Sequence, residues 1–363
     1  MVPTRRRTHV IKNGMAPNGI GTFRPFRVVV PNRVDLAGGT LDIYPLYLLI
    51  GDAMTVNAAV AVRSEIVVRP FRRGAARLFS GNFGIAVTAA DTHGFSLGGK
   101  LGLLSRALRH FPAVSAVDIR ARNDAPVGSG IGASSALLVA LMLASARMTG
   151  ASIRAEETAR AAMEIEAAHL KSLTGRQDHL AALRGGIQGI RFLPGRIEAR
   201  RLPPGGRAGV MLRDHGFLAH TGVAHHSSDV NWRMIRGAID GDAGILRKFR
   251  GIAAAATEAW EAVSASDPEK TGAAIASEWG IRKTLAPGVS TPGIQTLFSD
   301  RRFRRLVSGA KLCGAGGGGV LFGLLRDPDD REAVDALLSG AGMSVFPFRL
   351  SGGPRFEEIG DGG

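Results

Sequence analysis

The sequence has a single cysteine, two tyrosines and no long hydrophobic run. Cys313 alone cannot form an intramolecular disulfide, which is typical of proteins from a reducing compartment. The longest apolar stretch, around residues 137–144, is far shorter than the roughly 20 residues that cross a bilayer. No apolar segment follows the arginines at 5–7, as one would in a signal peptide. These absences predict a cytoplasmic protein with no membrane partner.

Negative charge is also scarce, because 46 Lys and Arg face 31 Asp and Glu, a net charge of +15. The basic residues are scattered, aromatic residues make up only 6% of the chain, and no zinc-finger, RRM-like or basic-zipper pattern is present. We therefore expect no nucleic-acid partner. A positive surface can still attract anionic substrates such as ATP or sugar phosphates.

What is present is a chain long enough for two globular domains, with 363 residues, 45% of them hydrophobic. Residues 1–22 are polar and predict a flexible tail. A passage rich in Gly, Pro and Arg at 194–209 predicts the boundary between domains at 23–195 and 205–355.

Hydrophobic periodicity predicts both helices and strands in each half. In the first half we expect strands at 26–30, 54–68 and 117–121, and helices at 134–148 and 155–171. In the second half we expect helices near 229–240, 244–265, 270–285 and 331–338, and strands at 320–325 and 344–350.

The most informative stretch is DAPVGSGIGASSA at residues 124–136, where alternating glycines and two serines open an apolar helix. Bare N–H groups at the positive end of a helix bind phosphates. The loop has no lysine, which excludes a Walker A loop. It matches the dinucleotide pattern G-x-G-x-x-A, but residues 123–126 separate it from the preceding strand, and no acidic residue follows at the ribose-binding distance.

Three motifs in order resemble the GHMP kinase superfamily, which includes galactokinase, homoserine kinase and mevalonate kinase. They are VPNRVDLAGGTLD at 30–42, the loop at 124–136, and KLCGAGGGG at 311–319. EIE at 164–166 and GRQD at 175–178 look like a stretch of the sugar-1-kinases related to D-glycero-D-manno-heptose 7-phosphate kinase and L-fucokinase. The segment HTGVAHHSSD at 220–229 is similar to another stretch of that branch.

The resemblance implies an α+β fold with two domains. The N-terminal half would be like ribosomal protein S5 domain 2, the C-terminal half would be ferredoxin-like, and the active site would lie in the cleft between them. It implies ATP and Mg²⁺ as cofactors and a sugar or sugar phosphate as the partner, in a monomer or homodimer.

The resemblance also assigns roles to residues of this chain. Asp178 would accept or orient the attacking hydroxyl, and Arg33 would pair with that aspartate or with the γ-phosphate. Ser134 and Glu166 would hold Mg²⁺. The ATP phosphates would lie on the loop residues Gly128, Ser129, Gly130, Ile131, Gly132, Ala133, Ser134 and Ser135. The acceptor would be bound by Asp42, Gly39, Arg176, Gly314, Gly316, Gly317 and Gly318.

Structural alternatives exist for each role. Asp178 or Ser134 could cap a helix, Glu166 could be solvated, Arg33 could form a surface ion pair, and Asp42 could be a turn residue. The chain also departs from the family around the acceptor, where Arg176 replaces a lysine, His179 a common glutamine, and His225 an expected arginine.

The hypothesis from sequence is an ATP-dependent kinase that phosphorylates a sugar or sugar phosphate, with the anomeric hydroxyl of a heptose 7-phosphate as leading acceptor. One alternative is a GHMP kinase with a non-sugar alcohol acceptor. The other is a non-catalytic sensor of ATP and sugar.

Overall fold

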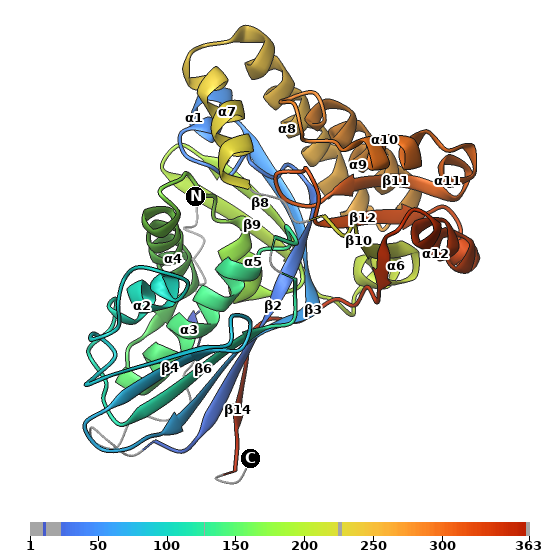
Figure 1. Ribbon diagram of the computed structural model, residues 1–363. Helices are drawn as coiled ribbons and strands as arrows, with labels where there is room; N and C mark the ends of the chain where they lie inside the picture. Colours follow the sequence, from blue (N-terminus) through green and yellow to red (C-terminus); the bar gives the residue numbers. More distant parts are fainter. Residues whose placement is uncertain (1–9, 12–22, 127, 224–226, 361–363) are drawn as a thin grey trace, which may run out of the picture.

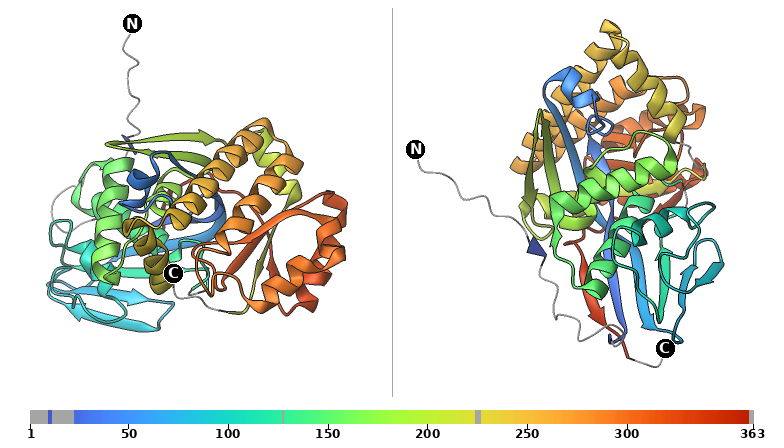
Figure 2. Two further views of the ribbon diagram at one scale, coloured as in Figure 1. Left: turned by 90° about the horizontal axis from the view of Figure 1, so that it is seen from above. Right: turned by 90° about the vertical axis from the view of Figure 1, so that its left-hand side faces the viewer.

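The computed structural model describes residues 10–11, 23–126, 128–223 and 227–360. Two lobes lie side by side, one built around a large sheet and the other around a small one (Figure 1). The view from above in Figure 2 shows the same separation, with the last part of the chain forming the second lobe.

The large sheet has the strand order β14-β2-β3-β6-β4-β5, and the pair β8–β9 extends it from β3. Its centre is the long antiparallel pair β2 and β3, in which Phe26 lies opposite Val68 and Arg33 opposite Ala59. Among the strand pairs that the structure describes, β4–β6 alone is parallel. The strands are β2 (Phe26–Ala37), β3 (Ala53–Pro70), β4 (Ala76–Ser80), β5 (Ile85–Ala89), β6 (Val117–Asn123), β8 (Ile187–Leu193), β9 (Arg196–Leu202) and β14 (Arg355–Glu358).

Helices cover this sheet, and α3 is the central one. Its residues from 138 to 146 are buried all round, as its continuous apolar sequence predicts, and it packs against β2 and β3. Helices α2, α4 and α5 pack around it (Figure 1). The helices of this lobe are α1 (Leu46–Ile50), α2 (Gly102–Leu108), α3 (Ala133–Thr149), α4 (Ala155–Leu170) and α5 (Gln177–Arg184).

The second lobe is an antiparallel sheet with the order β11-β12-β10-β13, and α9 packs against β11. Helix α8 packs against both α9 and the β2–β3 pair, so it joins the lobes. The strands are β10 (Gly216–His220), β11 (Val307–Leu312), β12 (Val320–Leu325) and β13 (Ser344–Phe346). The helices are α6 (Arg207–His215), α7 (Ser227–Ile239), α8 (Ala243–Ala265), α9 (Pro268–Arg282), α10 (Pro292–Ser299), α11 (Arg301–Leu306) and α12 (Arg331–Gly340), with a short 3₁₀ turn at Pro328–Asp330.

The predicted strands are present, but the last is shorter than the expected 344–350, since β13 ends at Phe346, and the first is longer than expected. We expected it to end at residue 30, whereas β2 runs to Ala37 and changes register between Pro31 and Asn32. Residues 30–37 of the first GHMP-like motif are therefore in a strand, and residues 38–42 follow it in a turn. The predicted domain boundary stays a prediction, since β9 occupies part of the passage at 194–209 and β14 returns to the large sheet.

Most of the predicted tail lies outside the described residues. Of residues 1–22, only the strand β1 (Val10–Ile11) is described, and it pairs with β7 (Ile153–Arg154). Within the described part of the chain, no helix combines the length and apolar character needed to cross a bilayer.

Candidate active site

The glycine-serine loop leads directly into α3 and presents open backbone. Gly128, Gly130 and Gly132 have φ values of +75°, +75° and +72°, in the left-handed region that glycine adopts without strain. No side chain caps the N-terminus of α3, so its first N–H groups have no partner within the helix. The buried Ser129 hydroxyl also lacks a hydrogen-bond partner among the described residues. The loop therefore offers unused donors where an anion can bind.

Glu166 lies beside these donors and joins three helices. Its carboxylate accepts hydrogen bonds from Ser134 Oγ at 2.6 Å and from Ser135 Oγ at 2.8 Å, while His179 Nε2 of α5 is 3.1 Å away. Glu166 is only 2% exposed, which excludes the solvated alternative. Burial alone would raise the pKa of Glu166, but the bonds from His179, Ser134 and Ser135 lower it below its usual value.

This cluster fits a magnesium ion chemically. Mg²⁺ prefers oxygen ligands, uses one or two carboxylates and keeps several waters. Ser134 Oγ and Glu166 Oε1 are adjacent oxygens at the end of the helix that carries the free N–H groups. The serine bonds Glu166 and does not cap α3, so the capping alternative is not realised.

Arg33 and Asp178 form a two-pronged ion pair next to the loop. Arg33 Nε lies 2.7 Å from Asp178 Oδ1, its second nitrogen lies 2.8 Å from Oδ2, and a third donates to the carbonyl of Gly130 at 2.6 Å. Arg33 is 5% exposed, so this is no surface pair. Burial disfavours the charge of Arg33, yet the field of Asp178 raises its pKa above the ordinary value. Asp178 lies in the first turn of α5 and does not cap it.

Asp42 is buried near the same helix. Its Oδ2 accepts a hydrogen bond from the backbone N–H of Gln177 at 2.9 Å, and the carboxylate lies against the backbone of Gly175. Burial raises the pKa of Asp42 to about 6, and the charge of Asp178 adds to the effect. Asp42 therefore supports the first turn of the helix that carries Asp178.

The third motif packs against the second. Val320 N–H donates to the carbonyl of Ser129 at 2.8 Å, so β12 begins against the glycine-serine loop. Gly319 has φ +81°, and a Cβ atom there would lie 2.5 Å from that same carbonyl oxygen. Gly317 N–H donates to the carbonyl of Val289 at 2.8 Å. This close backbone packing explains why the chain uses glycine here.

A buried network of four charges, which we call the ion quartet, holds the first motif to the second lobe. Lys311 Nζ lies 2.8 Å from Asp35 Oδ2 and 3.1 Å from Glu278 Oε2, and Arg282 Nε donates to Glu278 Oε1 at 2.7 Å. All four side chains are 0% exposed. Arg282 also donates to Gly39 O and Thr40 Oγ1.

Sequence reasoning gave no role to the members of the ion quartet. Asp35 and Lys311 lie inside two of the motifs, but Glu278 and Arg282 come from α9, outside all of them. The i, i+4 spacing of Glu278 and Arg282 was the available signal, although on a helix it usually marks a solvated pair. His179 was noted only as a departure from the family.

The other residues that were predicted to bind the acceptor make different contacts in the structure. Gly39 lies against Asp35 and, through its carbonyl, Arg282. Arg176 is half-buried next to Gly175 and has no ion-pair partner within the described ranges. Gly316 and Gly318 lie against the carbonyls of Val289 and Val223. His225 lies outside the described residues.

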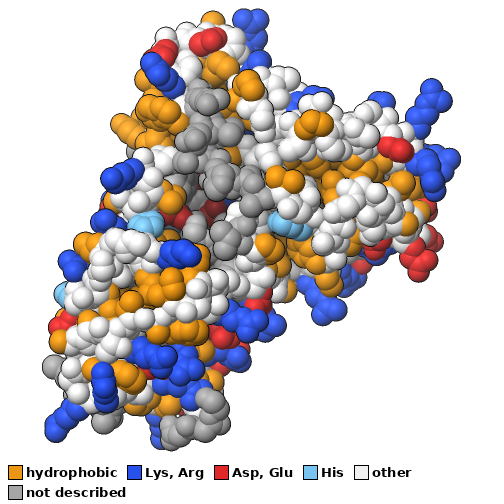
Figure 3. Space-filling view, in the orientation of Figure 1, with side chains coloured by type: hydrophobic (Ala, Val, Ile, Leu, Met, Phe, Trp, Pro, Cys, Tyr) orange, Lys and Arg blue, Asp and Glu red, His pale blue; other side chains and the backbone are white. Residues whose placement is uncertain are grey.

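Figure 3 shows a hollow between the two lobes, where acidic side chains are visible. The three motifs and the 164–178 stretch meet here through the contacts of Arg33, Asp178, Ser134, Glu166 and Val320.

Comparisons with known proteins point to the same family as the sequence motifs. The model of the GHMP kinases N-terminal domain matches residues 101–186, and that of the GHMP kinases C-terminal domain matches residues 259–339. The chain is 25% identical over 346 residues to the D-glycero-alpha-D-manno-heptose 7-phosphate kinase of Campylobacter jejuni, covering 91% of this chain and 98% of that protein. It is 29% identical over 235 residues to the mevalonate kinase of Aeropyrum pernix, covering 64% and 68%.

Among solved structures, a D-glycero-D-manno-heptose 1-phosphate kinase from Bacteroides thetaiotaomicron superimposes with a TM-score of 0.73 at 22% identity. The superposition covers 93% of this chain and all of that one. The α+β architecture of two domains that the motifs imply is confirmed. The chain belongs to the GHMP kinases, a family of phosphotransferases, and carries both domains of their fold.

Proposed function

We propose that this kinase transfers the γ-phosphoryl group of ATP to a hydroxyl of a sugar or sugar phosphate, and that the hydroxyl is the anomeric one of a heptose 7-phosphate. The observation that carries the kinase chemistry is the placement of Arg33–Asp178 directly beside the free N-terminus of α3. The choice of acceptor rests on the heptose 7-phosphate kinase of Campylobacter jejuni, which the chain matches over nearly its whole length.

Phosphoryl transfer has a loose transition state, so catalysis is mainly positioning and charge neutralisation. The acceptor hydroxyl oxygen forms the new bond to the γ-phosphorus, the bond to the β–γ bridging oxygen breaks, and ADP leaves. Asp178 orients the hydroxyl and accepts its proton. Arg33 fixes the carboxylate of Asp178 from two sides and offers positive charge next to the phosphates.

The ATP phosphates would bind to the N–H groups at the start of α3 and to the Ser129 hydroxyl. Ser134 and Glu166 would hold Mg²⁺, which when bound supplies positive charge between the phosphate oxygens. His179 and Ser135 both contact Glu166 Oε2, and this leaves Oε1, with Ser134, for the ion. Asp42 and Arg176 would contact the acceptor, Arg176 through its free positive charge.

A non-sugar acceptor is the second candidate, and the similarity to the mevalonate kinase of Aeropyrum pernix favours it. The deciding experiment is a panel of heptose 7-phosphate, hexose 6-phosphates, free aldoses, mevalonate and other hydroxy acids, read by ADP release with Mg²⁺. We expect ADP with a phosphosugar and loss of its reducing end, because the anomeric hydroxyl is consumed. ADP release with mevalonate alone would show that the acceptor is a non-sugar alcohol, as the second candidate states. ATP binding without ADP from any acceptor would favour a sensor.

A further inference from the structure

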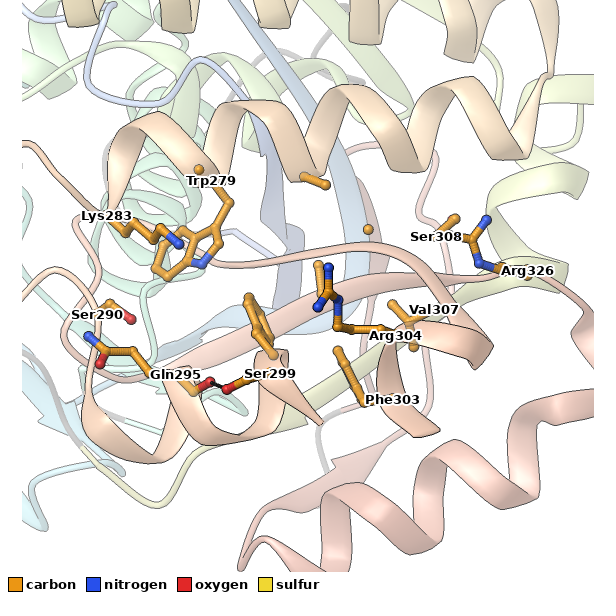
Figure 4. Close-up of a pocket in the computed structure, with 15 residues that line it drawn as sticks. Trp279, Lys283, Ser290, Gln295, Ser299, Phe303, Arg304, Val307, Ser308 and Arg326 are labelled. Carbon is orange, nitrogen blue, oxygen red and sulfur yellow. Dashed lines mark hydrogen bonds between the residues drawn. The ribbon is translucent and has the colours of Figure 1, made fainter. Parts of the chain in front are cut away.

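A groove of about 680 Å³ lies in the second lobe, between α9, β11 and the α10–α11 pair (Figure 4). Its volume is within the range of small-molecule sites, roughly 300–1,000 Å³. Its lining includes none of the residues assigned above to ATP, Mg²⁺ or the acceptor. The groove is thus separate from the proposed active site.

The charged side chains that line the groove are all basic. They are Lys283 from the end of α9, Arg304 from α11 and Arg326 after β12, and no acidic residue lines the groove. Arg326 forms an ion pair with Glu269, whereas Lys283 and Arg304 have no ion-pair partner in the part of the chain that the structure describes. Figure 4 shows Arg304 reaching from α11 toward α9 across the groove. Two unneutralised cations on opposite walls favour an anionic occupant.

The floor of the groove is apolar and well packed. Trp279 and Phe303 are 4% and 3% exposed, and Phe298 stacks on Phe303 with ring centroids 5.6 Å apart. At one end, the hydroxyl of Ser290 is buried and lacks a hydrogen-bond partner among the described residues. A rigid floor with a spare hydroxyl and two free cations can bind phosphate oxygens without first breaking internal bonds.

Two elements that line the groove also contact segments of the candidate active site. Ser290 follows Val289, whose carbonyl accepts the hydrogen bond from Gly317 in the glycine run. Helix α9 presents Trp279 and Lys283 to the groove, and it carries Glu278 and Arg282 of the ion quartet. A ligand in the groove would therefore contact the supports of the glycine run and of the first motif.

We propose that this groove is a regulatory binding site for a small molecule with two or more phosphate groups. Its volume exceeds what a single phosphate needs, and its two unpaired cations come from different walls, Lys283 from the end of α9 and Arg304 from α11. Binding there shifts the affinity of the cleft for its acceptor, because α9 and Val289 serve both sites. The proposal that the groove regulates the cleft rests on the proposed kinase function, whereas the proposal that it binds a compound with several phosphate groups does not.

The binding test uses inorganic pyrophosphate as the probe, titrated into the full chain by calorimetry in the presence of a saturating non-hydrolysable ATP analogue. The double variant Lys283→Glu/Arg304→Glu should weaken pyrophosphate binding about tenfold or more. The matched control Arg72→Glu/Arg73→Glu makes the same change of net charge on an exposed turn that is distant in sequence from the groove. It should bind pyrophosphate as the parent does. Trp279→Phe should reduce the tryptophan fluorescence change that accompanies binding.

Equal weakening in both double variants would overturn the proposal, because it would show only non-specific attraction to a basic chain. Unchanged binding in Lys283→Glu/Arg304→Glu would also overturn it. Both altered residues are exposed and unpaired, so we expect the melting temperature to stay near that of the parent.

The regulatory half is tested with the acceptor found in the panel above. Pyrophosphate should change the acceptor KM of the parent and of the Arg72→Glu/Arg73→Glu control, but leave that of Lys283→Glu/Arg304→Glu unchanged. Groove binding with no change in KM or kcat would overturn the regulatory role. A chain that releases no ADP from any acceptor, yet binds pyrophosphate in the groove, would contradict the proposed function and not the site.

Discussion

At the scale of single residues, only a few charged side chains form the candidate site, and Arg33 and Asp178 are the central pair. Arg33 and Asp178 come from a strand and a helix 145 positions apart, and meet through two hydrogen bonds of 2.7 and 2.8 Å. Arg33 and Asp178 are each other's main side-chain partner. A single substitution of Asp178 should therefore change turnover without changing the affinity for ATP.

Asp178→Asn keeps the size of the side chain but cannot accept a proton. We expect turnover to fall by about 10²–10⁴-fold, with the Kd for ATP close to that of the parent. Steady-state kinetics and calorimetry measure the two effects. Asp329→Asn on the exposed 3₁₀ turn is the matched control. Unchanged turnover in Asp178→Asn would remove this residue from the mechanism.

The pKa of about 6 at Asp42 predicts a pH dependence of stability. Because the pKa is raised on folding, the folded state binds more protons than the unfolded state between about pH 4 and 6. The contribution of Asp42 to stability is therefore fully present below about pH 4, and declines as pH rises through 6. Asp42→Asn removes this titration.

The melting temperatures of the parent and of Asp42→Asn, measured from pH 4 to pH 7, test this prediction. Relative to the parent, Asp42→Asn should become more stable as pH rises. A difference that stays constant over the whole range would show that Asp42 does not titrate there.

At the scale of elements, the site is made where the ends of helices and strands meet. The start of α3 supplies donors, α4 supplies Glu166, the start of α5 supplies Asp178, and the start of β12 closes against the loop. Close backbone approach between the loop and the glycine run is what brings the two domains together here.

Gly319→Ala tests that approach. The new Cβ would lie 2.5 Å from Ser129 O at a φ of +81°, so either the loop or β12 must move. We expect a loss of roughly 1–3 kcal/mol of unfolding free energy, with a fall in kcat because the phosphate loop shifts. Urea unfolding and kinetics measure both.

Gly293→Ala, which has open space around its Cα in α10, is the matched control and should be neutral or slightly stabilising. Equal effects of the two substitutions would refute the packing argument.

The sequence predicted the long elements, such as α3, α4 and β3, but fewer than half of the described helices and strands, and α5, which carries Asp178, was not among them. The apolar run of α3 and the β-branched pattern of β3 are strong local signals, and both elements lie within two residues of the expected bounds. The extension of β2 to Ala37 was not predicted, since it depends on pairing with β3 across a register shift between Pro31 and Asn32. Strand β10 was not predicted, since its pairing with β12 and β13 comes from distant segments.

At the scale of the whole molecule, the ion quartet links the lobes. Asp35 lies in the large sheet, while Lys311, Glu278 and Arg282 lie in the second lobe. Burial alone would raise the pKa of Asp35, but Lys311 and Arg282 hold it below its usual value. The charges balance, two against two, within a site closed to water.

Lys311→Met leaves two buried carboxylates with one cation. We expect it to lower the unfolding free energy by about 3–5 kcal/mol, as for other broken buried pairs. Adding Asp35→Asn should recover part of that loss, since the second substitution removes an unpaired charge. Urea unfolding of both single variants and the double variant gives the coupling energy.

Lys270→Met removes one partner of an exposed pair, and should cost less than about 1 kcal/mol. Strictly additive effects of Lys311→Met and Asp35→Asn would mean that the two side chains do not interact.

By itself the sequence determined the local features from which we predict the chemistry on the ATP side. A glycine-serine loop that opens an apolar helix has phosphate-binding properties wherever it folds, because they come from local backbone geometry and the free N–H groups of a helix end. The motifs that resemble GHMP kinases placed Asp178, Arg33, Ser134 and Glu166 in one site, and their pairing in the structure agrees with that expectation.

Only the tertiary structure decided which charges are buried and what they face. The ion quartet, the contact of His179 with Glu166 and the groove lined by Lys283 and Arg304 all join segments that are distant in sequence. A local pattern such as the i, i+4 spacing of Glu278 and Arg282 does not show that the charges are buried, because the cost of burying a charge depends on what surrounds it after the lobes have packed.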